Sequence, residues 1–292
     1  MRHVRVHSVD HLELRALDRT FQYDSAKTTE RLLVTTSIEA STQHRLGASV
    51  RVAALGFIVW AVGFLGLAAS GTAAQWEWAL AFLGPLILAI AVLMRGAFVR
   101  GRYGVGALVS FVLALVIQAA VFLPRTLGID VVGPGGTSFS YDAWGLAWIV
   151  GALGVLFVMR SKQSMLPTFQ GATFVQLSML LAGMLLYGVG FVELGSDRLN
   201  HEFGFVTFAG AVLIALSVIA QRKVLAQGIG APAAGICVLI AAVWAIKDVA
   251  RVIGNAMTDA TFAKEMVFGV EGVLLVLAVV GCALAARHLS QR

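Results

Sequence analysis

The chain has 292 residues, of which 59% are hydrophobic and 13% are charged. A soluble globular protein usually carries about 25% charged residues, so this composition indicates a membrane protein. The net charge of +6 does not indicate nucleic-acid binding, because the basic residues flank apolar segments and form no basic face with interleaved aromatic side chains. Cys237 and Cys282 both lie inside apolar stretches, so we expect neither a disulfide framework nor a metal site.

The first 49 residues contain no apolar run as long as the core of a secretory signal peptide. We therefore expect residues 1–49 to form a cytoplasmic N-terminal tail, and the first apolar segment to remain in the membrane as a signal anchor. Hydrophobic residues alternate with charges through this tail, which predicts amphipathic segments. Such a tail would either lie on the anionic inner leaflet or dock a partner protein.

Eight apolar segments follow the tail, each about as long as a bilayer crossing. A crossing needs about 20 mostly apolar residues, because the hydrocarbon core is about 30 Å thick and a helix rises about 1.5 Å per residue. The sequence therefore predicts an all-α polytopic membrane protein with eight transmembrane helices. The predicted spans are Val52–Ser70, Trp76–Met94, Val105–Leu123, Ala143–Met159, Phe174–Phe191, Phe205–Ala220, Gly230–Ile246 and Val267–Ala286.

Charged residues divide between the two sides of these spans. One side holds the tail, the loops after the second, fourth and sixth spans, and the C-terminus. It carries 17 of the 22 lysines and arginines, eight of them up to Arg51 and nine beyond it, whereas the other side carries ten of the 16 acidic residues. By the positive-inside rule, both termini face the cytoplasm. We expect the protein in the inner (plasma) membrane.

The second half of the membrane region resembles the first at a shift of about 124 residues. At this shift the sequence Gly-Val-Gly-Ala at 104–107 falls on Gly-Ile-Gly-Ala at 228–231. An even number of helices in each copy gives both copies the same orientation. The pattern predicts two parallel four-helix repeats, residues 50–162 and residues 163–292. Chance resemblance is the alternative, because glycine and alanine are abundant in this chain.

Charged side chains gather at the predicted outer ends of the spans. Glu271 lies four residues inside the eighth span, about 6 Å into the hydrocarbon by helical rise, where a carboxylate should seek a cation. Lys247 and Arg251, one turn apart on the preceding helix, are its expected partners. The group is either an ion-pair latch, or the mouth of a solute path or a small-ligand site. This predicted outer-leaflet cluster consists of Glu77, Glu193, Glu202, Lys247, Asp248, Arg251 and Glu271, and the repeat makes Glu77 and Glu202 equivalent.

The interiors of the predicted spans hold almost no ionisable side chains, which argues against a proton pump with a carboxylate at the midplane. Gln118 and Gln176 are the main intramembrane polar residues, and we expect them to bond neighbouring helices or to line a pore. Small residues four positions apart predict close helix contacts, either within the bundle or with a partner. These pairs are Gly66 with Ser70, Ala147 with Gly151, Ala231 with Gly235, and Gly281 with Ala285.

The sequence contains no catalytic or metal-binding motif, so we expect a protein that is not an enzyme and holds no cofactor. The favoured hypothesis is a scaffold or subunit of a membrane protein assembly, bound to another membrane protein or to a second copy of the chain. The alternative is a small-solute or ion permease or channel whose path runs between the two four-helix halves. An enzyme acting on lipid headgroups through His201, Glu202 or Glu271 is the least supported hypothesis, because nothing places a nucleophile beside a base.

Overall fold

The chain divides into two units, residues 1–45 and residues 46–292. The computed structural model describes only the second unit, at residues 46–70, 74–98, 101–129, 139–161, 174–196, 201–249 and 268–291. Almost all of the predicted N-terminal tail therefore lies outside the described residues. Every regular element in the described ranges is a helix, and no β-strand occurs in these ranges.

Six of the described helices are long and apolar enough to cross a membrane. A seventh crossing is present if α7 (His201–Ala220) and α8 (Arg222–Ile229), which meet at a bend of 59°, count as one span. The helix α9 (Ala231–Lys247) is also apolar, but at 17 residues it is shorter than the others. The protein is therefore a multi-pass membrane protein. The six long helices are Leu46–Ala69, α2 (Gln75–Leu93), α3 (Gly101–Ala120), α5 (Phe139–Arg160), α6 (Phe174–Ser196) and α12 (Val270–Ser290).

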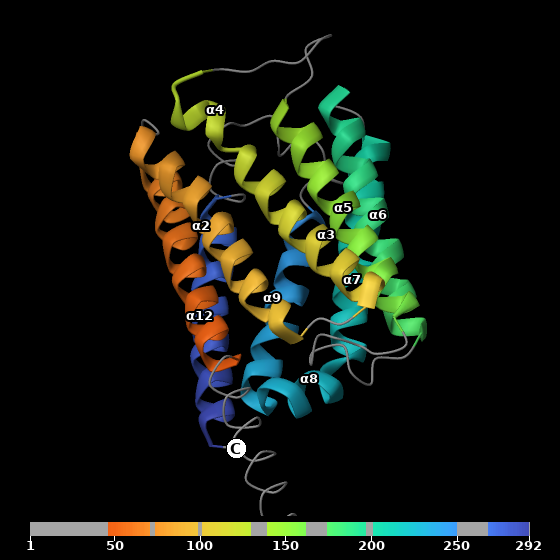
Figure 1. Cartoon of the computed structure of the whole chain (residues 1–292). Helices are drawn as coiled ribbons and strands as arrows, with labels where there is room; N and C mark the ends of the chain where they lie inside the picture. Colours follow the sequence, from red (N-terminus) through yellow and green to blue (C-terminus); the bar gives the residue numbers. More distant parts are fainter. Residues whose placement is uncertain are drawn as a thin grey trace, which may run out of the picture. The chain divides into compact units, whose positions relative to one another are not determined.

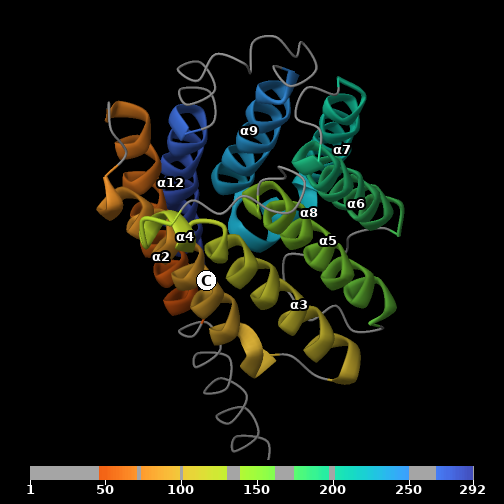
Figure 2. The same ribbon diagram turned by 90° about the horizontal axis from the view of Figure 1, so that it is seen from above.

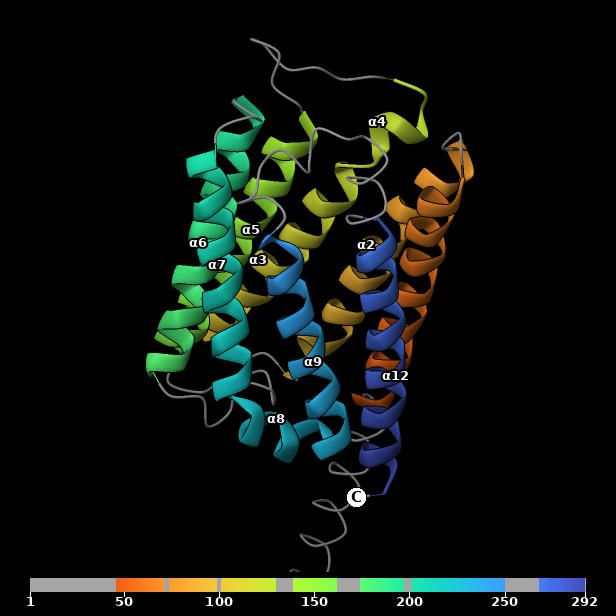
Figure 3. The same ribbon diagram turned by 180° about the vertical axis from the view of Figure 1, so that it is seen from behind.

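The long helices of residues 46–292 pack in the order in which they occur in the chain (Figures 1 and 2). Contacts run from α2 through α3, α5, α6, α7 and α9 to α12. The helix Leu46–Ala69 lies between the first and last helices of this order, because it packs against both α2 and α12. Figure 3 shows α7, α9 and α12 next to one another on the opposite face from Figure 1.

Two short helices mark opposite ends of this bundle (Figure 1). The helix α4 (Leu123–Thr126) follows α3 at one end, and α8 follows α7 at the other end, where the chain also terminates. We refer to these as the α4 end and the α8 end. At the α8 end the chain turns into α9 at Gly230, whose φ of 88° is a conformation that side-chain-bearing residues rarely adopt.

Glycines bring neighbouring helices together at two crossings. A Cβ atom added to Gly145 of α5 would lie 2.5 Å from the carbonyl oxygen of Gly188 in α6. A Cβ atom added to Gly210 of α7 would lie 2.5 Å from the backbone nitrogen of Tyr187, also in α6. Helices in lipid associate through close packing and polar contacts, because the surrounding acyl chains are as apolar as leucine. These contacts make α5, α6 and α7 a closely packed group.

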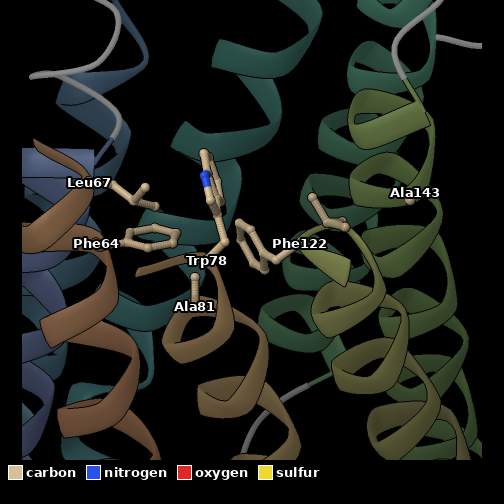
Figure 4. Close-up of a cluster of buried hydrophobic side chains, with 7 residues drawn as sticks. Phe64, Leu67, Trp78, Ala81, Phe122 and Ala143 are labelled. Carbon is tan, nitrogen blue, oxygen red and sulfur yellow. The ribbon is translucent and has the colours of Figure 1, made fainter. Parts of the chain in front are cut away.

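Aromatic side chains fill the half of the bundle nearer the α4 end. Figure 4 shows Phe64, Trp78 and Phe122 in contact, with centroid separations of 5.6 Å between the two phenylalanines and 6.3 Å between Trp78 and Phe122. Phe122 also contacts Trp144 of α5, at 6.0 Å, and this contact links two aromatic groups into one network. The network comprises Trp60, Phe64, Trp78, Phe122, Tyr141, Trp144, Trp148, Tyr187, Phe191, Trp244 and Phe268.

Candidate functional site

An ion pair between Lys247 and Glu271 joins α9 to α12 at the α4 end. Lys247 lies in the last turn of α9 and Glu271 in the first turn of α12, and these two helices are in contact. The Lys247 ammonium donates a hydrogen bond to Glu271 Oε1. Each charge also has the sign that its helix end favours, because a helix dipole stabilises cations at its C-terminus and anions at its N-terminus.

Asp248 adds a second carboxylate to this pair. Its side chain is fully buried, and its Oδ1 atom lies 3.7 Å from the Lys247 ammonium. The Lys247 side chain is only 3% exposed and that of Glu271 only 14%. One ammonium is therefore held between two carboxylates and largely shielded from solvent, which makes the attraction between these groups stronger than at an exposed surface.

The structure pairs Glu271 with Lys247, as predicted, and describes only part of the rest of the predicted cluster. Arg251 lies outside the described residues, and the side chain of Glu202 is not among those described. Glu193 is half-buried near the C-terminal end of α6. Lys247 makes charge contacts with Asp248 and Glu271, and we call these three residues the Lys247 triad.

Glu77 forms a separate contact between the helix Leu46–Ala69 and α2. Its carboxylate oxygen Oε2 accepts hydrogen bonds from the Ser70 hydroxyl and from the Ala74 backbone N–H, each at 2.9 Å. Glu77 is only 3% exposed, and Gly66 leaves room for it, because a Cβ atom there would lie 3.2 Å from its Oε1. Glu77 thus caps α2 from its third helical position.

The two intramembrane glutamines lie at opposite ends of the bundle, which corrects their predicted placement in span interiors. Gln118 is buried close to the C-terminus of α3, at the α4 end. Gln176 lies in the first turn of α6, at the α8 end, where its Nε2 donates a hydrogen bond of 3.0 Å to the carbonyl oxygen of Ala220. Gln118 and Gln176 therefore cannot line one cavity at the midplane. Gln176 serves the alternative role expected for it, a hydrogen bond between helices.

Three of the four predicted small-residue pairs have a glycine that packs within the bundle. Gly66 faces Glu77, Gly151 faces Met184, and Gly281 faces Ile236. The fourth pair, on α9, behaves differently. Both Ala231 and Gly235 are exposed, and no atom lies within 4 Å of a Cβ added to Gly235. This pair therefore offers a small-residue surface that the described part of the chain leaves uncovered.

Sequence reasoning treated Arg95 as an ordinary loop charge, but the structure half-buries it. Arg95 lies in the short 3₁₀ helix Met94–Phe98 that follows α2, and its Nε donates a hydrogen bond of 3.2 Å to Ser49 Oγ. At the same end, His288 of α12 has a buried Nε2 atom with no hydrogen-bond partner in the part of the chain described here. Arg95 and His288 each lie at the end of an apolar run, and this position is the sequence signal that could have identified them.

The described side chains support ion pairing and hydrogen bonding between helices. Within the described ranges, no group of three histidine, cysteine or acidic residues has an arrangement that could hold a metal ion. The protein matches no known family model, and neither curated proteins nor solved structures show a significant similarity to it. Function must therefore be inferred from the geometry of this chain alone.

Proposed function

We propose that this protein is a non-catalytic integral membrane protein that acts as a scaffold or subunit of a membrane protein assembly. The observation that supports this most is how its polar side chains are used. The Lys247 triad links α9 to α12, Glu77 links the first described helix to α2, and Gln176 links α6 to α7. Each predicted candidate whose contacts are described serves helix packing, and none is paired as a nucleophile and base would be.

We propose an arrangement with eight crossings and both termini in the cytoplasm. With α9 as a crossing, its 17 residues rise about 26 Å, a small mismatch that a bilayer accommodates by local thinning. The charges support this orientation. All described acidic residues belong to the α4 end, whereas the described basic residues of the α8 end are Arg51, Arg95, Arg102, Arg160, Arg222, Lys223 and Arg287.

We also propose that the two four-helix halves arose by duplication. Two matching contacts support this. Trp60 on the first helix packs against Gly84 on the second, and Tyr187 on the fifth packs against Gly210 on the sixth. In both halves the aromatic residue four positions later, Phe64 or Phe191, is buried in the same aromatic network. The two halves would then be parallel repeats around an axis along the membrane normal.

The partner surface in this proposal is the exposed face of α9. Small residues allow the backbones of two membrane helices to approach closely, and Gly235 has open space around it. Large apolar side chains on the same helix, Leu239 and Ile246, are 46% and 68% exposed. A partner helix packed over this face would cover both the small residues and these apolar side chains.

The test is whether the protein is part of a larger assembly at its native expression level. We expect chemical cross-linking in intact membranes, followed by extraction in mild detergent, to yield a complex larger than one chain. Gly235→Leu should remove this complex without unfolding the protein, because Gly235 is exposed and a Cβ atom there has no atom of the described chain within 4 Å. Val109→Leu, at an exposed position of α3, is the matched control. A monodisperse single chain from wild-type membranes would contradict the proposal.

The permease alternative has less support from the geometry. Its path would run between the two four-helix halves, but Trp144 of the first half and Phe191 of the second stack at 5.8 Å in that seam. Trp148 and Trp244 make a second aromatic contact across the halves, at 5.4 Å. A solute flux assay in proteoliposomes tests this alternative, and we expect no flux above that of protein-free vesicles.

A further inference from the structure

The half-buried guanidinium of Arg95 lies at the α8 end. Arginine has five N–H donors, and within the described residues this side chain makes a single hydrogen bond, from Nε to Ser49 Oγ at 3.2 Å. Ser49 is 1% exposed, and its hydroxyl in turn donates to the carbonyl oxygen of Leu46 at 2.9 Å. This short chain of hydrogen bonds fixes the guanidinium against the beginning of the Leu46–Ala69 helix.

The described part of the chain provides no counter-ion for Arg95. The carboxylates of the Lys247 triad lie at the opposite end of the bundle and pair with Lys247. The Cys282 thiol of α12 lies near Arg95, but it is neutral at physiological pH in its ordinary state and is no counter-ion. A partly buried cation is costly unless it is paired, so we expect an anion from outside the described residues to pair with this guanidinium.

The position of Arg95 identifies the chemistry of that anion. The apolar run of α2 ends at Leu93 and Arg95 follows two residues later, which places the guanidinium at the edge of the hydrocarbon layer. The surrounding α8 end is basic, and none of its described residues is acidic. Arginine binds phosphate oxygens through paired N–H donors, and basic sites between spans on the cytoplasmic side bind phospholipid headgroups.

We infer that Arg95, oriented by Ser49, binds the phosphate of an anionic phospholipid from the leaflet at the α8 end. The inference rests on the proposed orientation only for the statement that this leaflet is the cytoplasmic one. The lipid binds the folded state, so it stabilises that state by mass action. The site adds a specific lipid ligand to the proposed scaffold, and it lies at the opposite end from the Lys247 triad.

The experiment compares the full-length protein in nanodiscs of phosphatidylcholine with nanodiscs that also contain phosphatidylglycerol. We expect the thermal unfolding midpoint of the wild type to be higher with phosphatidylglycerol, and native mass spectrometry to show this lipid retained in preference to phosphatidylcholine. Arg95→Gln should weaken phosphatidylglycerol binding about tenfold or more, because it removes a charge-assisted contact. Arg160→Gln, which removes an exposed charge from the same end, should leave the binding nearly unchanged.

Four results would overturn the inference. The first is a wild-type protein that gains no stability from phosphatidylglycerol and retains no preferred lipid, a measurement that needs no variant to fold. The second is an equal loss in Arg95→Gln and Arg160→Gln, which would indicate general surface attraction. The third is equal stabilisation by inorganic phosphate in phosphatidylcholine nanodiscs, which would indicate a free anion. The fourth is an Arg95→Gln variant that is equally destabilised in both lipids, which would indicate a partner within the chain.

All of these readouts come from a single chain in a nanodisc. They are therefore independent of the cross-linking test for an assembly. A protein that is monomeric in native membranes but retains phosphatidylglycerol through Arg95 would contradict the proposed function and support the lipid site.

Discussion

Breaking the Lys247 triad should destabilise the protein by an amount that depends on which partner is removed. Loss of one member of a buried ion pair costs about 3–5 kcal/mol of unfolding free energy. Lys247→Gln leaves both Glu271 and Asp248 without their shared ammonium. We therefore expect a loss at the upper end, about 4–5 kcal/mol. Glu271→Gln leaves Lys247 beside Asp248, so we expect a smaller loss of about 2 kcal/mol.

The double variant is the decisive measurement, because groups that interact directly have effects that do not add. Contacting residues in a double-mutant cycle show coupling energies of about 0.5–3 kcal/mol. We expect Lys247→Gln with Glu271→Gln to lose at least about 1 kcal/mol less than the sum of the single losses. Equilibrium unfolding in mild detergent, followed by tryptophan fluorescence and by circular dichroism, provides the free energies.

The control for this cycle is Asp142→Asn, at a half-buried acid in the first turn of α5 at the same end of the bundle. It removes a charge of the same sign without touching the triad, and its effect should add to that of Glu271→Gln. If the Lys247 and Glu271 losses also add, the two residues are not energetically paired, and the interpretation of the triad as a latch is wrong.

Two further variants test the helix contacts. Gly84→Ala should lower the unfolding free energy by about 1–3 kcal/mol through overpacking, because the new Cβ would lie 2.4 Å from the Cβ of Trp60. Gly235→Ala is the control and should be neutral, because no described atom lies within 4 Å of its new Cβ. Equal thermal unfolding midpoints for the two variants would refute this prediction. Ser70→Ala should lower the unfolding free energy by about 1 kcal/mol, because it removes the hydrogen bond from Ser70 to Glu77. The same substitution should have a smaller effect in a protein that already carries Glu77→Gln.

Helix positions were predictable from the sequence because burial in lipid demands long apolar runs. Each predicted segment contains a helix, but the ends differ where hydropathy carries no information. The third span was expected at 105–123 and lies at Gly101–Ala120. A separate turn, α4, begins at Leu123 with Pro124 in its first turn, a position that suits proline. This shift is what moves Gln118 from the interior of the span to its end.

The role of Glu77 could not be predicted because the usual sequence signature is incomplete. A capping box normally has serine or threonine at the N-cap and glutamate at the third helical position. Here the N-cap is Ala74, so only the half of the motif in which Glu77 accepts from the N-cap N–H exists, and the hydroxyl of Ser70, directly after the Leu46–Ala69 helix, donates a further hydrogen bond to the Glu77 carboxylate. Only the fold brings that hydroxyl into place, whereas the Lys247 pairing followed from two adjacent helix ends of opposite charge.

The proposed repeat also shows the limit of aligning apolar sequences. The alignment placed Gly106 on Gly230, but Gly106 is packed against Phe157 inside α3, while Gly230 opens α9 with a positive φ. Two described glycines of the first half have a positive φ: Gly128 at the α4 end, at 71°, and Gly101 at the α8 end, at 74°. Gly101 and Gly230 each follow a short helical segment at the α8 end. The similar turns at Gly101 and Gly230 therefore favour a duplication whose shift is slightly larger than the shift of about 124 residues that the sequence alignment gives.

The two ends of the bundle balance charge in different ways, and this difference connects topology to function. At the α4 end, Lys247 is neutralised by carboxylates of its own chain. At the α8 end, which the proposed orientation places in the cytoplasm, basic residues beside the spans follow the positive-inside rule, and the described residues place no carboxylate near Arg95. The six acidic residues that this orientation assigns to the same side all lie within residues 1–45, outside the described ranges. An anionic lipid would neutralise Arg95 after insertion without changing the charge of the polypeptide.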